Sequence, residues 1–122
     1  MKAAILSAFA LIAVPFVAGA QQPPEGLVQK PRWIIEPATS VQAYYPPRAQ
    51  ELGRIGMAKI RCRVGEADIL TDCQILSEAP AGFGFGDALI RLTSRMKLEH
   101  LDGDGRPVEG RPVDIKLNFK LR

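Results

Sequence analysis

The residues from Val113 to Leu121 form the most regular pattern in this 122-residue chain. Apolar side chains occupy every second position, and polar side chains occupy the positions between them. Successive side chains of a β-strand point to opposite faces, so the pattern predicts a strand with one buried and one solvated face. Lys116 and Lys120 fall on the solvated face, where lysine resists unwanted pairing of an edge strand. A chain of this length supports one domain, in which this strand would form one side of the core.

The preceding residues predict the other elements of that domain. A short helix is expected at 47–52, because proline fits the first helical turn and a glycine follows the last residue. From Met57 the period changes to two and predicts a strand. Its buried positions would be Ala58, Ile60, Cys62 and Val64. A turn at 65–68 leads to a second strand at 70–77. The one long helix is expected at 87–98, where apolar residues recur at helical spacing.

Residues 1–20 have the composition of an export signal peptide. Lys2 is basic, an apolar run extends from Ala3 to Val14, and small residues end at Ala20. The alternative is an uncleaved inner-membrane anchor, because the helix from Ala3 to Ala20 would be about 27 Å long and would barely cross the hydrocarbon core. The short apolar run favours cleavage. We therefore expect an exported chain that begins at Gln21.

A proline-rich spacer is expected at 21–43, between this signal and a domain at 44–122. Its one apolar stretch is Trp33-Ile34-Ile35. We expect this stretch to lie against the domain, because an exposed triplet of this kind would promote aggregation.

Cys62 and Cys73 are the two cysteines of the chain. Cysteine pairs of exported proteins are normally oxidised, and this spacing is not that of a C-x-x-C redox site. If Cys62 opposes Cys73 in a hairpin, Val64 faces Thr71 and Gly65 faces Leu70. The loop would then be the four residues from Glu66 to Ile69, an ordinary hairpin length. A disulfide is predicted, and two buried free thiols are the alternative.

The sequence offers little for catalysis or for binding a cofactor. The glycines of Gly82-Phe83-Gly84-Phe85-Gly86 precede Asp87, which places an anion where a phosphate would bind. The single histidine, His100, and the two cysteines are a poor supply of metal ligands. The 16 Lys and Arg residues are interleaved with 13 Asp and Glu residues, which argues against a nucleic-acid surface. We expect a protein that is not an enzyme, with no cofactor, no metal, no nucleic-acid partner and no small-molecule substrate.

Five short motifs, in the same order and spacing, are similar to those of the C-terminal domain of the TonB family. They are Tyr45-Pro46-Pro47-Arg48-Ala49, Gly56, Ile75-Leu76-Ser77-Glu78-Ala79-Pro80, Gly84-Phe85-Gly86-Asp87-Ala88-Leu89 and Asp104-Gly105-Arg106-Pro107-Val108. The resemblance covers residues 45–122. It implies an α+β fold, in which a three-stranded antiparallel sheet is backed by one long and one short helix.

The resemblance also implies a place and a partner. Members of the family lie in the periplasm of Gram-negative bacteria, where they act as energy transducers for transmembrane transport. They bind a short peptide of an outer-membrane receptor, the TonB box, as a strand added along their final strand. The corresponding edge here is Asp114, Ile115, Lys116, Leu117, Asn118, Phe119 and Lys120, with Tyr44 as a further contact. The expected partner is a TonB-dependent receptor or another envelope protein, and strand exchange into a homodimer is left open.

Three differences from the family motivate an alternative. Met96-Lys97-Leu98-Glu99-His100 replaces an aromatic residue and a proline at the helix exit. The spacer is short, and the N-terminal segment has no histidine for a proton-channel partner. The alternative is a stand-alone envelope structural or interaction protein with the TonB fold and no energy-transducing role, cleaved or still anchored in the inner membrane.

Overall fold

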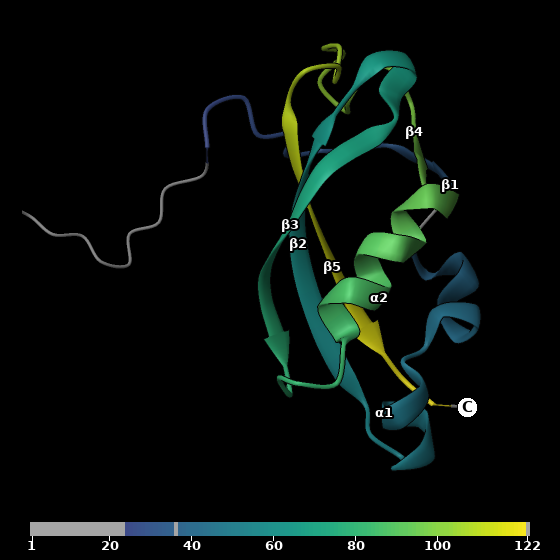
Figure 1. Ribbon diagram of the computed structural model, residues 1–122. Coiled ribbons are helices and arrows are strands. Elements are labelled where there is room, and N and C mark those ends of the chain that lie inside the picture. The colour runs from purple at the N-terminus through teal and green to yellow at the C-terminus, as the bar shows by residue number, and fades with distance from the viewer. Residues whose placement is uncertain (1–23, 36, 122) are drawn as a thin grey trace, which may run out of the picture.

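A three-stranded antiparallel sheet in the order β3-β2-β5 forms the centre of the molecule. The computed structural model describes residues 24–35 and 37–121, so the predicted signal peptide and the residues at its cleavage site lie outside the described part. The strands are β2 (Gly56–Val64), β3 (Leu70–Ala79) and β5 (Pro112–Phe119). The helix α2 (Phe85–Leu92) crosses one face of the sheet, and the short helix α1 (Pro47–Glu51) lies near the end where β5 finishes (Figure 1). The predicted α+β class and the helix-backed sheet are confirmed.

The alternating patterns place the core between the sheet and α2, as predicted. Every expected inward residue of β2 is buried. On β5 the buried side chains are Val113, Ile115, Leu117 and Phe119. The helix contributes Ala88, Leu89 and Leu92 from one side. The apolar faces of the strands and of α2 therefore pack together in one layer, which excludes water from the sheet and the helix.

The aromatic cluster at one end of this core is built around Phe85. Its ring centroid lies 5.1 Å from that of Phe119 and 6.0 Å from that of Tyr45. The same ring covers the backbone of Gly56, where a β-carbon would lie 2.6 Å from Phe85 Cδ2. Glycine at this position is therefore required by the close approach of an aromatic ring, since no larger residue leaves room for it.

The long helix is shorter than the sequence predicted. It ends at Leu92 and not at Leu98, because a 3-10 turn, η3 (Thr93–Arg95), follows directly. The Thr93 hydroxyl donates to the carbonyl of Ile90 at 2.6 Å, and such side-chain bonds compete with helix continuation. The next residues form the short strand β4 (Lys97–Leu98), which pairs with β1 (Trp33–Ile35). Within the described residues, no helix has the length and apolarity to cross a membrane.

The residues before α1 lie against the domain. Trp33 packs on the core, as expected, although Ile34 and Ile35 of the same strand stay exposed. A long 3-10 segment, η1 (Pro37–Tyr44), connects β1 to α1 and contributes Val41 to the core. The stretch predicted to be a spacer is therefore folded onto the domain over much of its length.

The hairpin of β2 and β3 contains the predicted disulfide, in a register that differs from the prediction. The sulfur atoms of Cys62 and Cys73 lie 2.03 Å apart. Val64 faces Leu70 and not Thr71, because the register shifts by one residue beyond the cysteines. The shift occurs beside Asp72, whose φ of 50° marks a bulge. The alternation of apolar residues could not locate this extra residue, because the bulge changes only which residues of β2 and β3 lie opposite each other. The turn that follows β2 contains a second 3-10 segment, η2 (Glu66–Asp68).

Asp102 is a buried carboxylate that organises the loop before β5. One oxygen accepts the backbone N–H groups of Asp104 and Arg106, both at 2.9 Å, and the other accepts from the Arg111 guanidinium at 3.0 Å. The Arg106 N–H lowers the pKa of Asp102 most, burial opposes this, and Arg111 and the Asp104 N–H lower it further. The Asp102 carboxylate therefore holds this loop in place.

We expect Asp102→Asn to lower the melting temperature at neutral pH and to lose this effect in acid. Because the folded pKa is depressed, the carboxylate stabilises the fold above its unfolded value near pH ~3.9, and this contribution is lost as the pH falls through the folded pKa. Thermal unfolding of both proteins between about pH 2 and pH 7 checks the prediction. Asp104→Asn is the matched control, because that side chain is half exposed in a surface ion pair with Lys30. A constant difference at every pH would contradict it.

Candidate functional site

The candidate site is the edge of β5 that faces away from β2. Val64 donates its N–H to the carbonyl of Arg111 at 2.9 Å, which fixes which residues of the two strands exchange hydrogen bonds. In an antiparallel pair these residues alternate. The pairing of β2 with β5 continues without a shift from Arg63 and Pro112 to Gly56 and Phe119. The backbone groups of Val113, Ile115, Leu117 and Phe119 therefore point to β2, and those of the residues between them point outward.

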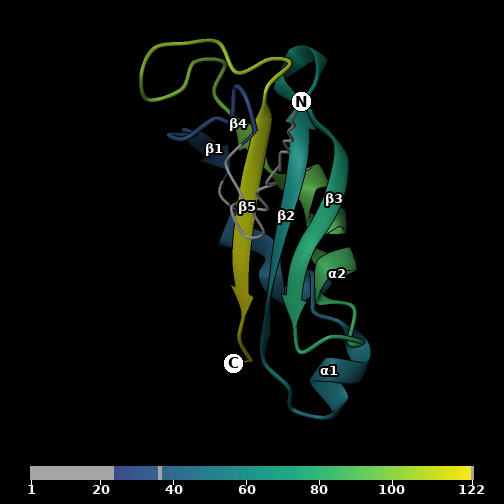
Figure 2. The ribbon, with the colours of Figure 1, turned by 90° about the vertical axis from the view of Figure 1, so that its left-hand side faces the viewer.

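Two hydrogen bonds close the ends of this outward row. The Val28 N–H donates to the Pro112 carbonyl at 2.9 Å, and the Gln42 side-chain amide donates to the Lys120 carbonyl at 2.9 Å. Between them lie the outward backbone groups of Asp114, Lys116 and Asn118. In residues 24–35 and 37–121, no hydrogen bond is formed to these groups. We call these three residues the open edge; Figure 2 shows β5 at one side of the sheet, with the strand β1 behind it.

The residues predicted for the peptide-binding edge divide into two sets. Ile115, Leu117 and Phe119 are buried and point their backbone groups to β2. Their backbone groups are therefore not available to an added strand. Asp114, Lys116, Asn118 and Lys120 have the outward positions. The alternation found in the sequence therefore gives the buried face of β5, and the hydrogen-bonding register with β2 gives the identity of its outward backbone groups.

Tyr44 is hydrogen-bonded to η3, the turn that follows α2. Its hydroxyl accepts a hydrogen bond of 3.3 Å from Arg95, and this bond lowers the pKa of Tyr44, helped by Ser94 and opposed by burial. Gln42, two residues earlier, is the side chain that reaches the edge. Gln42 is not among the predicted site residues, because a glutamine in an irregular segment carries no pattern signal. Only the packing of η1 brings it to β5.

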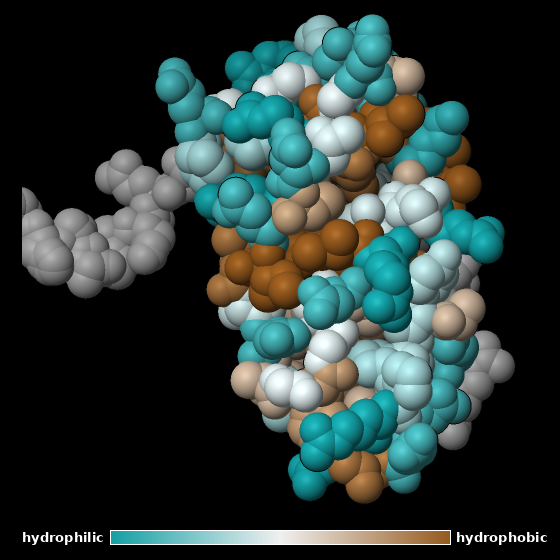
Figure 3. All heavy atoms as spheres, in the orientation of Figure 1, coloured by the Kyte–Doolittle hydropathy of each residue, from teal (hydrophilic) through white to brown (hydrophobic). Residues whose placement is uncertain are grey.

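The opposite edge of the sheet is less regular. The pairing of β3 with β2 shifts twice along its length, once beside Leu76 and once beside Asp72. Bulges of this kind twist an edge and break its hydrogen-bonding row. An apolar band lies on this side of the molecule, level with the middle of β3, where Ile75 and Leu76 are partly exposed (Figure 3). The edge of β5 is therefore the one with an uninterrupted row.

The glycine-rich segment that leads into α2 already binds a carboxylate of the protein itself, and a separate cleft lies beside the disulfide. The Gly86 N–H at the start of α2 donates to the Glu78 carboxylate at 2.7 Å, so a side-chain anion occupies the place where a phosphate would bind. A surface cleft of about 750 Å³ lies beside the disulfide and includes Arg63 and Asp72. Among the described residues, no group of three or more His, Cys, Asp or Glu side chains could hold a metal ion.

A known structure shares this architecture. The structure of the TonB2 protein from Vibrio anguillarum matches with a TM-score of 0.52 and 19% sequence identity, over 90% of this chain and 99% of the other. The fold is TonB-like. At this identity the likeness concerns the fold alone.

The sequence is also similar to that of a protein without a described activity. A protein of Caulobacter vibrioides, described as uncharacterized, is 28% identical over 69 residues, which cover 57% of this chain and 69% of the relative. No family model matches the sequence. The open edge of β5 presents backbone groups with which the backbone of another chain can pair.

Proposed function

We propose that this protein is a periplasmic binding module that takes up an extended peptide of an outer-membrane receptor as a fourth strand. The observation that carries the proposal is the open edge of β5. Its three outward residues follow one another at alternate positions, and the pairing beneath them has no register shift. An added strand gains affinity from main-chain hydrogen bonds and selectivity from alternate side chains.

The geometry limits the length of the peptide. Val28 and Gln42 occupy the two ends of the outward row, so a short segment fits between them without displacing either bond. The same two bonds protect β5 from pairing with another chain along its whole length, which is the usual hazard of an exposed edge. A short receptor peptide, as the TonB-like fold suggests, has the size and backbone chemistry for this place.

A second candidate is an envelope structural or interaction protein that binds by the same edge but transmits no force. The observation that favours it is the docking of residues 24–35 and 37–44 on the domain. A spacer folded in this way contributes little reach toward a distant receptor. Deletion of the protein would then alter envelope integrity without changing receptor-dependent uptake.

Titration with TonB-box peptides is expected to shift the amide resonances of residues 113–120. Asn118→Pro should abolish these shifts, because it removes an outward N–H while leaving the bonds to β2 intact, and proline is tolerated on edge strands. Asn118→Ala is the matched control and should bind like the original protein. Thermal unfolding of both variants establishes that they are folded. Shifts confined to the β2–β3 hairpin, or equal binding by the proline variant, would contradict the proposal.

A further inference from the structure

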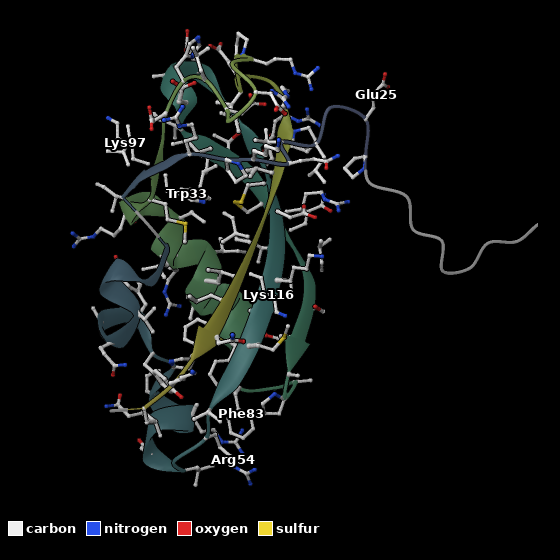
Figure 4. All side chains as sticks on the ribbon, turned by 180° about the vertical axis from the view of Figure 1, so that it is seen from behind. Glu25, Trp33, Arg54, Phe83, Lys97 and Lys116 are labelled. Carbon is white, nitrogen blue, oxygen red and sulfur yellow. A yellow bond between two sulfur atoms is a disulfide. The ribbon has the colours of Figure 1, made fainter. Side chains whose placement is uncertain are left out.

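The outer face of the sheet beside the open edge carries an uncompensated pair of like charges. Lys59 of β2 lies directly opposite Lys116 of β5. Directly opposed residues in an antiparallel pair have their side chains close together, and like charges there are destabilising. In the described part of the chain, neither lysine takes part in an ion pair. Figure 4 shows Lys116 at the middle of β5.

The neighbouring charges do not neutralise this pair. Asp114 is the carboxylate of the open edge, and the Arg61 guanidinium binds both of its oxygens, at 2.6 and 2.9 Å. Arg63 is further along β2 and donates to the Gly110 carbonyl. Lys120 adds another cation at the end of the row, on the same face as Lys116. An added strand would therefore bring its outer side chains next to a positive surface.

The inner side of the same edge is apolar. Ile115 and Leu117 are buried with 3% and 7% of their surfaces exposed, and Trp33 and Val41 pack against the core from the segments beside β5. Alternate side chains of an added strand face this apolar layer, and the others face the lysines. The two faces of the edge thus favour different chemistries.

We propose that the partner segment alternates apolar and acidic residues, and that its acidic side chain lies beside Lys116. This inference rests on the proposed strand addition and deepens it, because it assigns to Lys116 the choice of partner. A carboxylate there would also relieve the repulsion between Lys116 and Lys59. Charge complementarity at a solvated edge acts mainly on specificity and on the association rate, so salt should weaken the discrimination.

A charge-reversal experiment tests the proposal. Two synthetic peptides of about seven residues share valine at alternate positions and differ only in Asp or Lys between them, so that either can add as a strand. The original protein is expected to bind the Asp peptide about fivefold more tightly than the Lys peptide, and Lys116→Glu should reverse this preference. Lys97→Glu changes an exposed lysine of β4, outside the open edge, and should keep the original preference.

The outcomes separate this inference from the function on which it rests. If both peptides shift the resonances of the open edge with equal affinity, strand addition stands and the proposed selectivity is wrong. If neither peptide shifts them, strand addition fails as well. If Lys97→Glu changes the preference as much as Lys116→Glu, net charge and not position decides, and the assignment to Lys116 is overturned. Lys116→Gln provides a neutral variant, which should bind both peptides about equally.

Discussion

Phe85→Ala is expected to lower the free energy of unfolding by about 3–5 kcal/mol, the range for truncating a fully buried aromatic side chain. The Phe85 ring is fully buried and packs against Tyr45, Phe119 and the backbone of Gly56, so its removal leaves a cavity between these residues. Urea unfolding followed by circular dichroism measures the loss. Phe83→Ala is the matched control, because this nearby ring is partly exposed under Arg48 and Arg54, and it should cost much less.

The close packing of Phe85 on Gly56 predicts that substitutions at these two positions are coupled. Gly56→Ala alone should destabilise the protein by about 1–3 kcal/mol, because the new methyl group overlaps the ring. In a Phe85→Ala background the same substitution should cost far less, since the ring is gone. The two changes are therefore expected to be non-additive, as neighbouring sites usually are. Strict additivity would show that the ring does not constrain this position.

Loss of the disulfide between Cys62 and Cys73 is expected to lower the free energy of unfolding by about 3 kcal/mol. The bond closes a short loop, with a sequence separation of 11, and restricts the unfolded chain accordingly. For a domain whose total stability is about 5–15 kcal/mol, this is a large share. Urea unfolding with and without a reducing agent measures the effect.

The double variant Cys62→Ala, Cys73→Ala is the control for this experiment. It should be destabilised like the reduced protein, with a further small loss because Cys62 is buried, and it should not respond to the reducing agent. Intact-mass measurement of native material, with and without reductant, tests oxidation directly. Two thiols that are alkylated without reduction would contradict the predicted bond.

The periodic patterns of the sequence determined the main elements of this fold. Period two in β2 and β5 identified the buried residues of both strands. When one face of a strand is buried, its apolar side chains must occupy alternate positions, because a shift of one residue would move all of them to the solvated face. The helical spacing from Ala88 to Leu92 identified the face of α2 that covers them. The cysteines were also placed correctly in one hairpin. These features are local, and local sequence chemistry is sufficient to specify them.

Tertiary contacts decided the features that give the candidate site its shape. The early end of α2 depends on the pairing of Lys97 and Leu98 with β1, and the register of the hairpin depends on a bulge beside Asp72. Sequence reasoning identified the final strand as an edge, but it could not find the two bonds, from Val28 and Gln42, that limit that edge. Both donors come from irregular segments about 80 residues away in the chain, and the packing of such segments follows no period. The sequence by itself therefore determined which residues form β5, and only the folded chain determined which of its backbone groups remain open.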